Sequence, residues 1–141
     1  MPIKGLLIAG VIATVTIPLA ISATAVQPLS EIRAREQAEK QLKDEAAFTS
    51  KVCGTSVRAR IDWSTAQDWP ANANIAKSCD GALSALEAVC RSNKSKGSKV
   101  KSFVCKGDGS GPGLSGSTLV YGASPGSKGF GATKSMLDNE L

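Results

Sequence analysis

The chain has 141 residues, with 17 basic and 12 acidic side chains, four cysteines and no histidine. This length accommodates one domain and leaves no room for a second sizeable core. The lack of histidine excludes Ser-His-Asp and Cys-His catalysis and removes the commonest zinc ligand, while an aromatic content of 4% argues against a stacking platform for single-stranded nucleic acid.

The N-terminal region has the pattern of an export signal. Residues 5–26 contain no charged side chain, Lys4 precedes them, and the small residues Ala23 and Ala25 are typical of a cleavage site. These features predict a signal peptide over 1–25, cleaved after Ala25. The competing interpretation is an uncleaved membrane anchor, because an apolar stretch of this length can also span a bilayer. Both interpretations deliver the rest of the chain outside the cytoplasm, to a periplasmic or extracellular location.

A charged helix is predicted over residues 29–48. The stretch is rich in helix formers, and its acid–base pairs at i, i+4 are typical of an exposed helix. Its apolar positions are too sparse for a wide stripe that could join a core. We therefore expect a solvated linker or spacer helix, followed by a folded domain over residues 51–141.

The domain begins with a strand and a helix. Residues 57–63 alternate apolar and polar side chains, which is the pattern of a strand with one buried face. Apolar residues then recur at spacings of three and four, which predicts an amphipathic helix over roughly 71–92. The remaining predicted elements are a strand at 100–105, a glycine-rich loop at 107–116, a strand at 117–121 and a closing helix at 128–140.

This β-α-β-β-α order predicts a small α+β domain with two layers, stapled by disulfides. The helices cover one face of the sheet and leave the other face open. The alternation in the first strand places Arg58 and Arg60 on that open face. Such a face is either solvated or a docking surface.

Four cysteines in an exported chain favour disulfide bonds over a metal site. Cys79 and Cys90 are separated by about 16 Å along the predicted helix, beyond the ~7 Å reach of a disulfide. Two pairings remain, Cys53–Cys79 with Cys90–Cys105, or Cys53–Cys90 with Cys79–Cys105. A βαβ unit brings Cys53 and Cys90 to one end of the layers and the other two to the opposite end, so the second pairing is predicted.

The densest basic stretch is a candidate contact for anions or a partner. It is loosely spaced and is suited to phosphates, acidic polysaccharide or lipid head groups, or else it is a solvated loop. Nucleic acid is not an expected partner. Together with the two open-face arginines, the candidate contact residues are Arg58, Arg60, Arg91, Lys94, Lys96, Lys99, Lys101 and Lys106.

No catalytic motif is complete. The glycine-rich residues 107–112 differ in order from the nucleophile loop of chymotrypsin-like proteases, and the S-x-x-K match at 98–101 lacks its companion motifs. Carboxylates such as Asp62 and Asp68 have no spacing that compels a catalytic dyad, which leaves a small carboxylate hydrolase as a minor alternative. We therefore expect a protein that is not an enzyme and carries no cofactor or metal ion.

The leading hypothesis is an exported structural or accessory protein that binds another envelope or membrane protein. It rests on the incomplete catalytic motifs together with the anchor alternative, the spacer helix and the open sheet face. The alternative is a secreted binding or inhibitor module that contacts polyanions through the basic stretch at 91–106.

Overall fold

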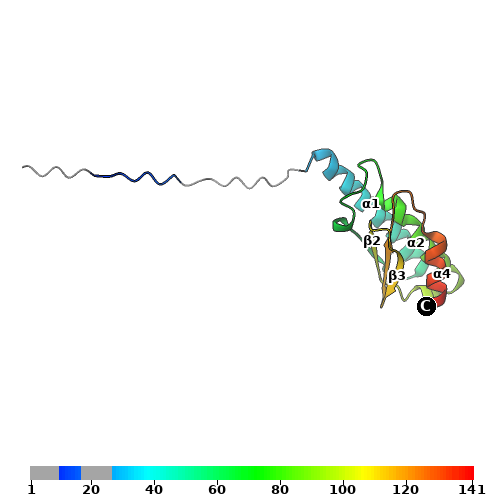
Figure 1. Cartoon of the computed structure of the whole chain (residues 1–141). Coiled ribbons are helices and arrows are strands. Elements are labelled where there is room, and N and C mark those ends of the chain that lie inside the picture. The colour runs from blue at the N-terminus through cyan, green and yellow to red at the C-terminus, as the bar shows by residue number, and fades with distance from the viewer. Residues whose placement is uncertain (1–9, 17–26) are drawn as a thin grey trace, which may run out of the picture.

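The computed structural model describes residues 10–16 and 27–141 of the chain (Figure 1). Residues 10–16 form neither helix nor strand. The remainder of the predicted signal peptide or anchor, including its cleavage site, lies outside the described residues. Within the described ranges, no helix is both long enough and apolar enough to cross a bilayer.

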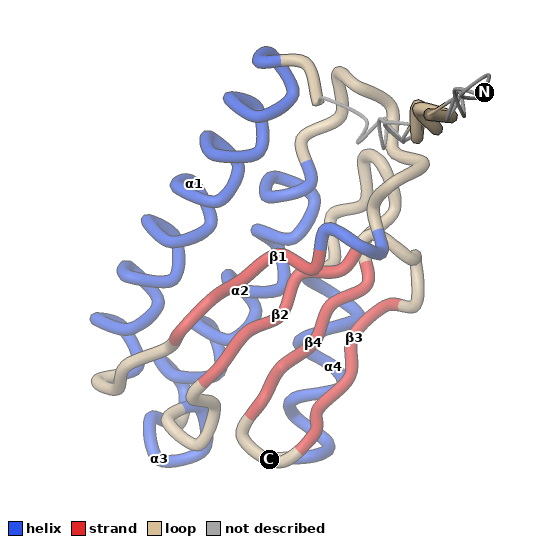
Figure 2. The backbone as a smooth tube through the Cα atoms, turned by 90° about the vertical axis from the view of Figure 1, so that its left-hand side faces the viewer, coloured by secondary structure: helices blue, strands red, loops and turns tan. Residues whose placement is uncertain are grey.

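Within residues 27–141 the chain folds into two layers, a mixed sheet and a set of helices packed on one of its faces. Figure 2 shows α1, α2 and α4 behind the strands, which leaves the opposite face of the sheet open. The mixed α+β class predicted from the sequence is confirmed. The elements are α1 (Leu29–Cys53), β1 (Arg58–Asp62), a 3-10 turn (Trp63–Thr65), α2 (Ile75–Ser92), α3 (Lys94–Gly97), β2 (Ser102–Lys106), β3 (Gly111–Ser115), β4 (Thr118–Gly122) and α4 (Phe130–Glu140).

The strand order in the sheet is β1-β2-β4-β3. β1, β2 and β4 run parallel, and β3 is antiparallel to β4. The crossover from β1 to β2 passes through α2, as a parallel pair requires. Phe103 of β2 and Leu119 of β4 are in register and fully buried against the helices. Each contributes about 2 kcal/mol through the apolar area that it removes from water.

The glycine-rich stretch predicted to be a loop contains β3, so the sheet has one strand more than expected within residues 27–141. The sequence of β3 is GPGLS, which has weak strand propensity and reads locally as a turn. It forms a strand because β4 supplies the backbone partners, and it lies at the sheet edge, where proline is tolerated.

The expectation of a solvated linker helix is wrong for the C-terminal half of α1. The helix runs to Cys53, past the predicted domain boundary, and ends at Gly54, whose φ of 64° is in the left-handed region. Its buried side chains recur every three or four residues and pack against α2 and β1. The stripe escaped prediction because most of its members are small: Ala38, Leu42, Ala46, Thr49 and Cys53.

The start of α2 also differs from the predicted one. The helix begins at Ile75, because the side chain of Asn74 accepts a hydrogen bond from the Lys77 amide at 3.1 Å and caps the first turn. Residues 66–74 are therefore an irregular connection, and this connection forms one wall of the cleft described below.

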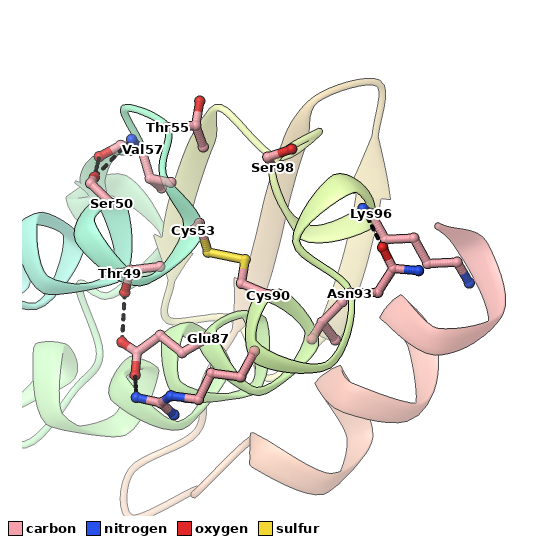
Figure 3. Close-up of a disulfide and its surroundings, with 12 residues drawn as sticks. Thr49, Ser50, Cys53, Thr55, Val57, Glu87, Cys90, Asn93, Lys96 and Ser98 are labelled. Carbon is pink, nitrogen blue, oxygen red and sulfur yellow. Dashed lines mark hydrogen bonds and ion pairs between the residues drawn. A yellow bond between two sulfur atoms is a disulfide. The ribbon is translucent and has the colours of Figure 1, made fainter.

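Two buried disulfides fasten the helices to each other and to the sheet. Cys53–Cys90 joins the ends of α1 and α2 with a Cα–Cα distance of 5.0 Å (Figure 3), and Cys79–Cys105 joins α2 to β2 at 5.9 Å. This is the pairing that the βαβ topology predicts. Two disulfides indicate an oxidising location, consistent with export from the cytoplasm.

Each disulfide should contribute several kcal/mol to stability. The sequence separations of 37 and 26 residues correspond to about 4 kcal/mol per bridge in the chain-entropy model. We expect Cys53→Ala/Cys90→Ala and Cys79→Ala/Cys105→Ala each to lower the free energy of unfolding by about that amount, measured by urea denaturation. A loss below about 1 kcal/mol for the first pair would show that packing alone holds α1 in place.

Candidate functional site

A cleft lies between the N-terminal half of α1 and the connection from β1 to α2. Its volume is about 700 Å³, and we call it the α1 cleft. It contains both tryptophans of the chain. Its walls carry Arg35 and Ala38 on the α1 side and Trp63, Trp69, Pro70 and Ile75 on the other.

The cleft exists because α1 is longer than the element it packs against. α1 has 25 residues and α2 has 18, and the two helices are fastened at their C-terminal ends. The first turns of α1 therefore extend past the start of α2, as Figure 2 shows. The connection after β1 fills the other side. The carboxyl ends of β1, β2 and β4 point to this end of the molecule, which is where open parallel sheets commonly bind ligands.

Trp63 is held against α1 by two contacts. Its indole N–H donates a hydrogen bond to Oε1 of Glu39 at 2.8 Å. The guanidinium of Arg35 lies over the indole ring, 5.0 Å from the centroid, in a cation–π contact. Arg35 also forms an ion pair with Glu31 at 3.0 Å. This wall of the cleft is therefore already ordered before any partner binds.

Trp69, on the same side of the cleft as Trp63, is fixed to the end of β2. Its indole N–H donates to the carbonyl of Gly107 at 2.8 Å, and the Gly107 amide donates to the hydroxyl of Thr65 at the same distance. A Cβ at position 107 would lie 2.6 Å from the Trp69 indole nitrogen and 2.7 Å from the Ala66 Cβ. Only glycine permits this approach, so the position of the wall depends on residue 107.

The chemistry of the cleft favours apolar contact over proton transfer. Small apolar side chains, those of Ala34, Ala38, Ala66 and Ala73, line it beside the indoles. Both indole N–H groups are already engaged. The charged lining among the described residues is the Glu31–Arg35 pair, in which each charge offsets the other. Uncharged polar side chains also line the cleft, so it can bind a segment of chain through apolar contact with the tryptophans and alanines and through hydrogen bonds to Ser30, Gln37, Gln67 or Asn72.

The predicted basic stretch is divided by the fold. Lys106 lies at the carboxyl end of β2, about 16 Å along the strand from the end that carries the rest of the stretch. Arg58, at the start of β1, joins those residues, since its amide donates to the Lys101 carbonyl at 3.0 Å. Lys51 also lies at this end, because the Cys53–Cys90 disulfide fastens the last turn of α1 to the end of α2. Nothing in the sequence around Lys51 predicted that position. We call this group the basic pole: Lys51, Arg58, Arg91, Lys94, Lys96, Lys99 and Lys101.

The fold explains part of this charge. α1, α2 and α4 all end at the basic pole, as Figure 2 shows, and helix C-termini carry partial negative charge. Arg91 lies 3.7 Å from the buried carboxylate of Glu87, and the ammonium of Lys99 lies 3.5 Å from the backbone oxygen of Leu141. Lys51 and Lys94 are exposed and have no ion-pair partner among residues 27–141.

Arg58 and Arg60 are exposed on the sheet face opposite the helices. Ile61, the next residue along β1, is buried on the side of α1. In register with Arg60 lie Val104 of β2 and Val120 of β4, so the centre of the open face is apolar. The open face therefore combines two valines largely covered by their neighbours with a cationic border along β1.

Asp62, one of the carboxylates considered for catalysis, and Asp108 have local structural roles. The hydroxyl and amide of Ser64 donate to Asp62, and with the nearby charges of Arg60 and Lys106 they hold the pKa of Asp62 below its usual value. Ser110 donates to Asp108 in the same way and lowers the pKa of that carboxyl. A general acid needs a raised pKa, so neither group is suited to that role at neutral pH.

The seam between α1 and α2 contains a buried acid, Glu87, and two half-buried ones, Glu45 and Asp80. Glu87 is buried and accepts a hydrogen bond from the hydroxyl of Thr49 at 2.8 Å (Figure 3). Burial raises the pKa of Glu45, and the charge of Asp80 and a hydrogen bond to it raise that pKa further. No cluster of three or more metal-ligating side chains occurs in the part of the chain that the structure describes. The protonation state of the Glu45 carboxyl should therefore affect the stability of the seam.

Comparison of the chain with protein-family models, with curated proteins and with solved structures finds no match.

The Glu45 carboxyl should make stability depend on pH. Its folded-state pKa is raised, so the folded state holds this proton more tightly than the unfolded state does. Stability contributed by this group is present below the unfolded pKa of about 4.3 and is lost as the pH rises through the raised pKa. We expect Glu45→Gln to raise the melting temperature at pH 7 and to flatten the profile between about pH 4 and 7.

Glu36→Gln, on the exposed side of the same helix, is the matched control and should leave the profile unchanged. A lower melting temperature for Glu45→Gln at pH 7 would mean that the ionised carboxylate stabilises the seam.

Proposed function

We propose that this chain is an exported, non-catalytic binding protein whose α1 cleft takes up an apolar segment of another envelope or membrane protein. The observation that carries the proposal is the placement of both tryptophans, already ordered, around a cleft of about 700 Å³ with an alanine-rich lining. Preordered walls lower the entropic cost of association.

The residue types in the cleft match those that dominate binding energy in protein interfaces. Tryptophan and arginine are enriched among such residues, and here Trp63, Trp69 and Arg35 lie in one cleft. The small alanines permit a partner backbone to approach closely. A largely apolar segment is favoured over a charged ligand because the indole N–H groups and the Arg35 charge already have partners.

A second candidate function is contact with a polyanion at the basic pole. It is favoured by the exposure of Lys51, Lys94, Lys99 and Lys101 at one end of the molecule. Their charges exceed what the helix C-termini and the Glu87 carboxylate offset. Contact of this kind would be electrostatic, tolerant of polymer sequence and strongly dependent on salt.

Cross-linking from inside the cleft tests the leading proposal. Ala34 lines the cleft and is exposed, and Ala47 is an exposed alanine of α1 outside it, so the two are matched sites for a photoreactive benzoylphenylalanine. In the native envelope we expect one discrete protein adduct from position 34 and none from position 47. Ala34→Trp should fill the cleft and weaken the affinity of the purified partner by about 30-fold or more, while Ala47→Trp should not.

The proposal fails if both positions give the same adducts, or if Ala34→Trp and Ala47→Trp bind the partner equally well. Melting temperatures of the two variants would establish that both are folded.

Charge-matched variants test the polyanion candidate. We expect Lys94→Gln/Lys96→Gln/Lys99→Gln to elute from dextran-sulfate resin at a lower salt concentration than the native chain, because fewer counterions are released on binding. The control carries the same change in net charge at Lys40, Lys77 and Lys134, away from the basic pole, and should elute close to the native position. Equal shifts for both triple variants would mean that net charge alone determines retention.

A further inference from the structure

The outer edge of β1 offers unpaired backbone groups. The Arg58 amide donates to the Lys101 carbonyl at 3.0 Å, so in this parallel ladder residues 58 and 60 direct their backbone groups toward β2. Ala59 and Ile61 direct theirs the other way. Neither residue has a backbone hydrogen bond on that side to any part of the chain that the structure describes.

The unpaired stretch has defined ends. Before it, the Ser50 hydroxyl on α1 accepts from the Val57 amide at 2.9 Å (Figure 3). After it, the Asp62 carbonyl accepts from the Thr65 hydroxyl at 2.7 Å, and the Trp63 carbonyl accepts from the Ala66 amide. Two amides and two carbonyls, those of Ala59 and Ile61, are therefore left for a partner outside the described fold.

A hollow lies beside these groups. Its volume is about 230 Å³, and its walls are Glu39, Leu42 and Lys43 of α1 and Ala59, Arg60 and Ile61 of β1. Ile61 is only 7% exposed and Ala59 is half-buried, so solvent reaches this part of the edge mainly through the hollow. Backbone donors and acceptors in such a place are nearly always paired, with protein or with ordered water.

We infer that β1 pairs with an extended segment of a protein partner, which adds a fifth strand to the sheet. The inference deepens the proposed function and rests on it. Glu39 lines the hollow and accepts the indole N–H of Trp63, which lines the α1 cleft, so the two spaces are neighbours along α1. One partner segment can occupy the cleft and continue along β1.

The side chains around the edge specify the chemistry of the segment. On the open face it would lie beside the exposed cations Arg58 and Arg60, with Lys43 at the rim. On the helix face it would meet Ala59, Ile61 and Leu42. Cross-strand pairs of opposite charge and of apolar groups stabilise a sheet, so the segment carries acidic and small apolar residues in alternation.

Two carboxylates near the edge, Glu39 and Asp62, reduce this charge preference but are outnumbered by the cations Arg58, Arg60 and Lys43. Glu39 accepts the Trp63 indole N–H, and Asp62 accepts from Ser64 and lies in register with Lys106. The other sheet edge is less suited to recognition, because Pro112 of β3 lacks an amide donor and Gly111 and Gly113 offer no side chain.

Amide hydrogen exchange, followed by NMR on the full chain, tests the inference residue by residue. In the free protein the Ala59 and Ile61 amides should exchange faster than those of Arg58 and Arg60, which are bonded to β2. Addition of the peptide Glu-Val-Glu-Val-Glu-Val-Glu should slow exchange at Ala59 and Ile61 by about tenfold or more. A peptide with lysine in place of each glutamate should have no such effect.

Backbone methylation of the peptide separates strand pairing from charge attraction. N-methyl groups on the valines remove one edge of amides from the peptide, and N-methyl groups on the glutamates remove the other. If the peptide pairs along one of its edges, one methylated peptide should no longer slow exchange at Ala59 and Ile61. The other should slow it as the unmethylated peptide does. Equal behaviour of the two methylated peptides overturns the inference, as does slow exchange at Ala59 and Ile61 in the free protein.

The cleft and the edge can fail separately. Ala34→Trp fills the cleft without altering β1, so peptide protection at Ala59 and Ile61 should persist in that variant. A cross-link from position 34 without any peptide effect at β1 refutes the added strand and leaves the proposed function standing. Peptide protection at β1 without a position-specific cross-link supports the added strand and refutes binding in the cleft.

Discussion

The attachment of α1 to α2 at one end is the constraint on which the other features depend. The Cys53–Cys90 disulfide joins the two helix ends, and the buried hydrogen bond from Thr49 to Glu87 lies one turn away from it. Because α1 is the longer helix, fastening it there leaves its first turns extended past α2. That extension forms one wall of the α1 cleft. The same attachment brings Lys51 beside the end of α2 and completes the basic pole.

The two ends of the molecule are therefore chemically different. The carboxyl ends of the parallel strands and the α1 cleft lie at one end, and the helix C-termini and the basic pole lie at the other. α1 spans about 37 Å between them. Pro28 lines the cleft, so the chain enters the domain at the cleft end.

Sequence reasoning succeeded where a covalent or periodic constraint acts locally. The positions of the four cysteines on a βαβ unit were sufficient to choose the pairing that the structure has. Alternation along β1 also placed Ile61 inward and Arg60 outward. β3 was missed because its glycines and proline carry a turn signal, and only the register with β4 makes it a strand.

The cleft was beyond prediction for a different reason. Trp63 and Trp69 each have local sequence surroundings of an ordinary strand end and turn. Their role depends on Glu39 and Gly107, which are 24 and 38 residues away. The core stripe of α1 was missed because alanine is both a helix former and a small core residue, so its presence alone does not show which face is buried. Contacts between distant segments, made by small residues, leave little periodic signal.

Cations along the edge of β1 affect two kinds of association in opposite ways. Charged side chains on an edge strand are a common protection against pairing between identical sheets. If two copies paired along β1 in antiparallel fashion, Arg58 and Arg60 of each would lie near the same residues of the other, and like charges in that arrangement are destabilising. An acidic strand reverses the sign of the same interaction. The arginines can therefore disfavour self-association and still admit a complementary partner, since specificity is a difference between two binding free energies.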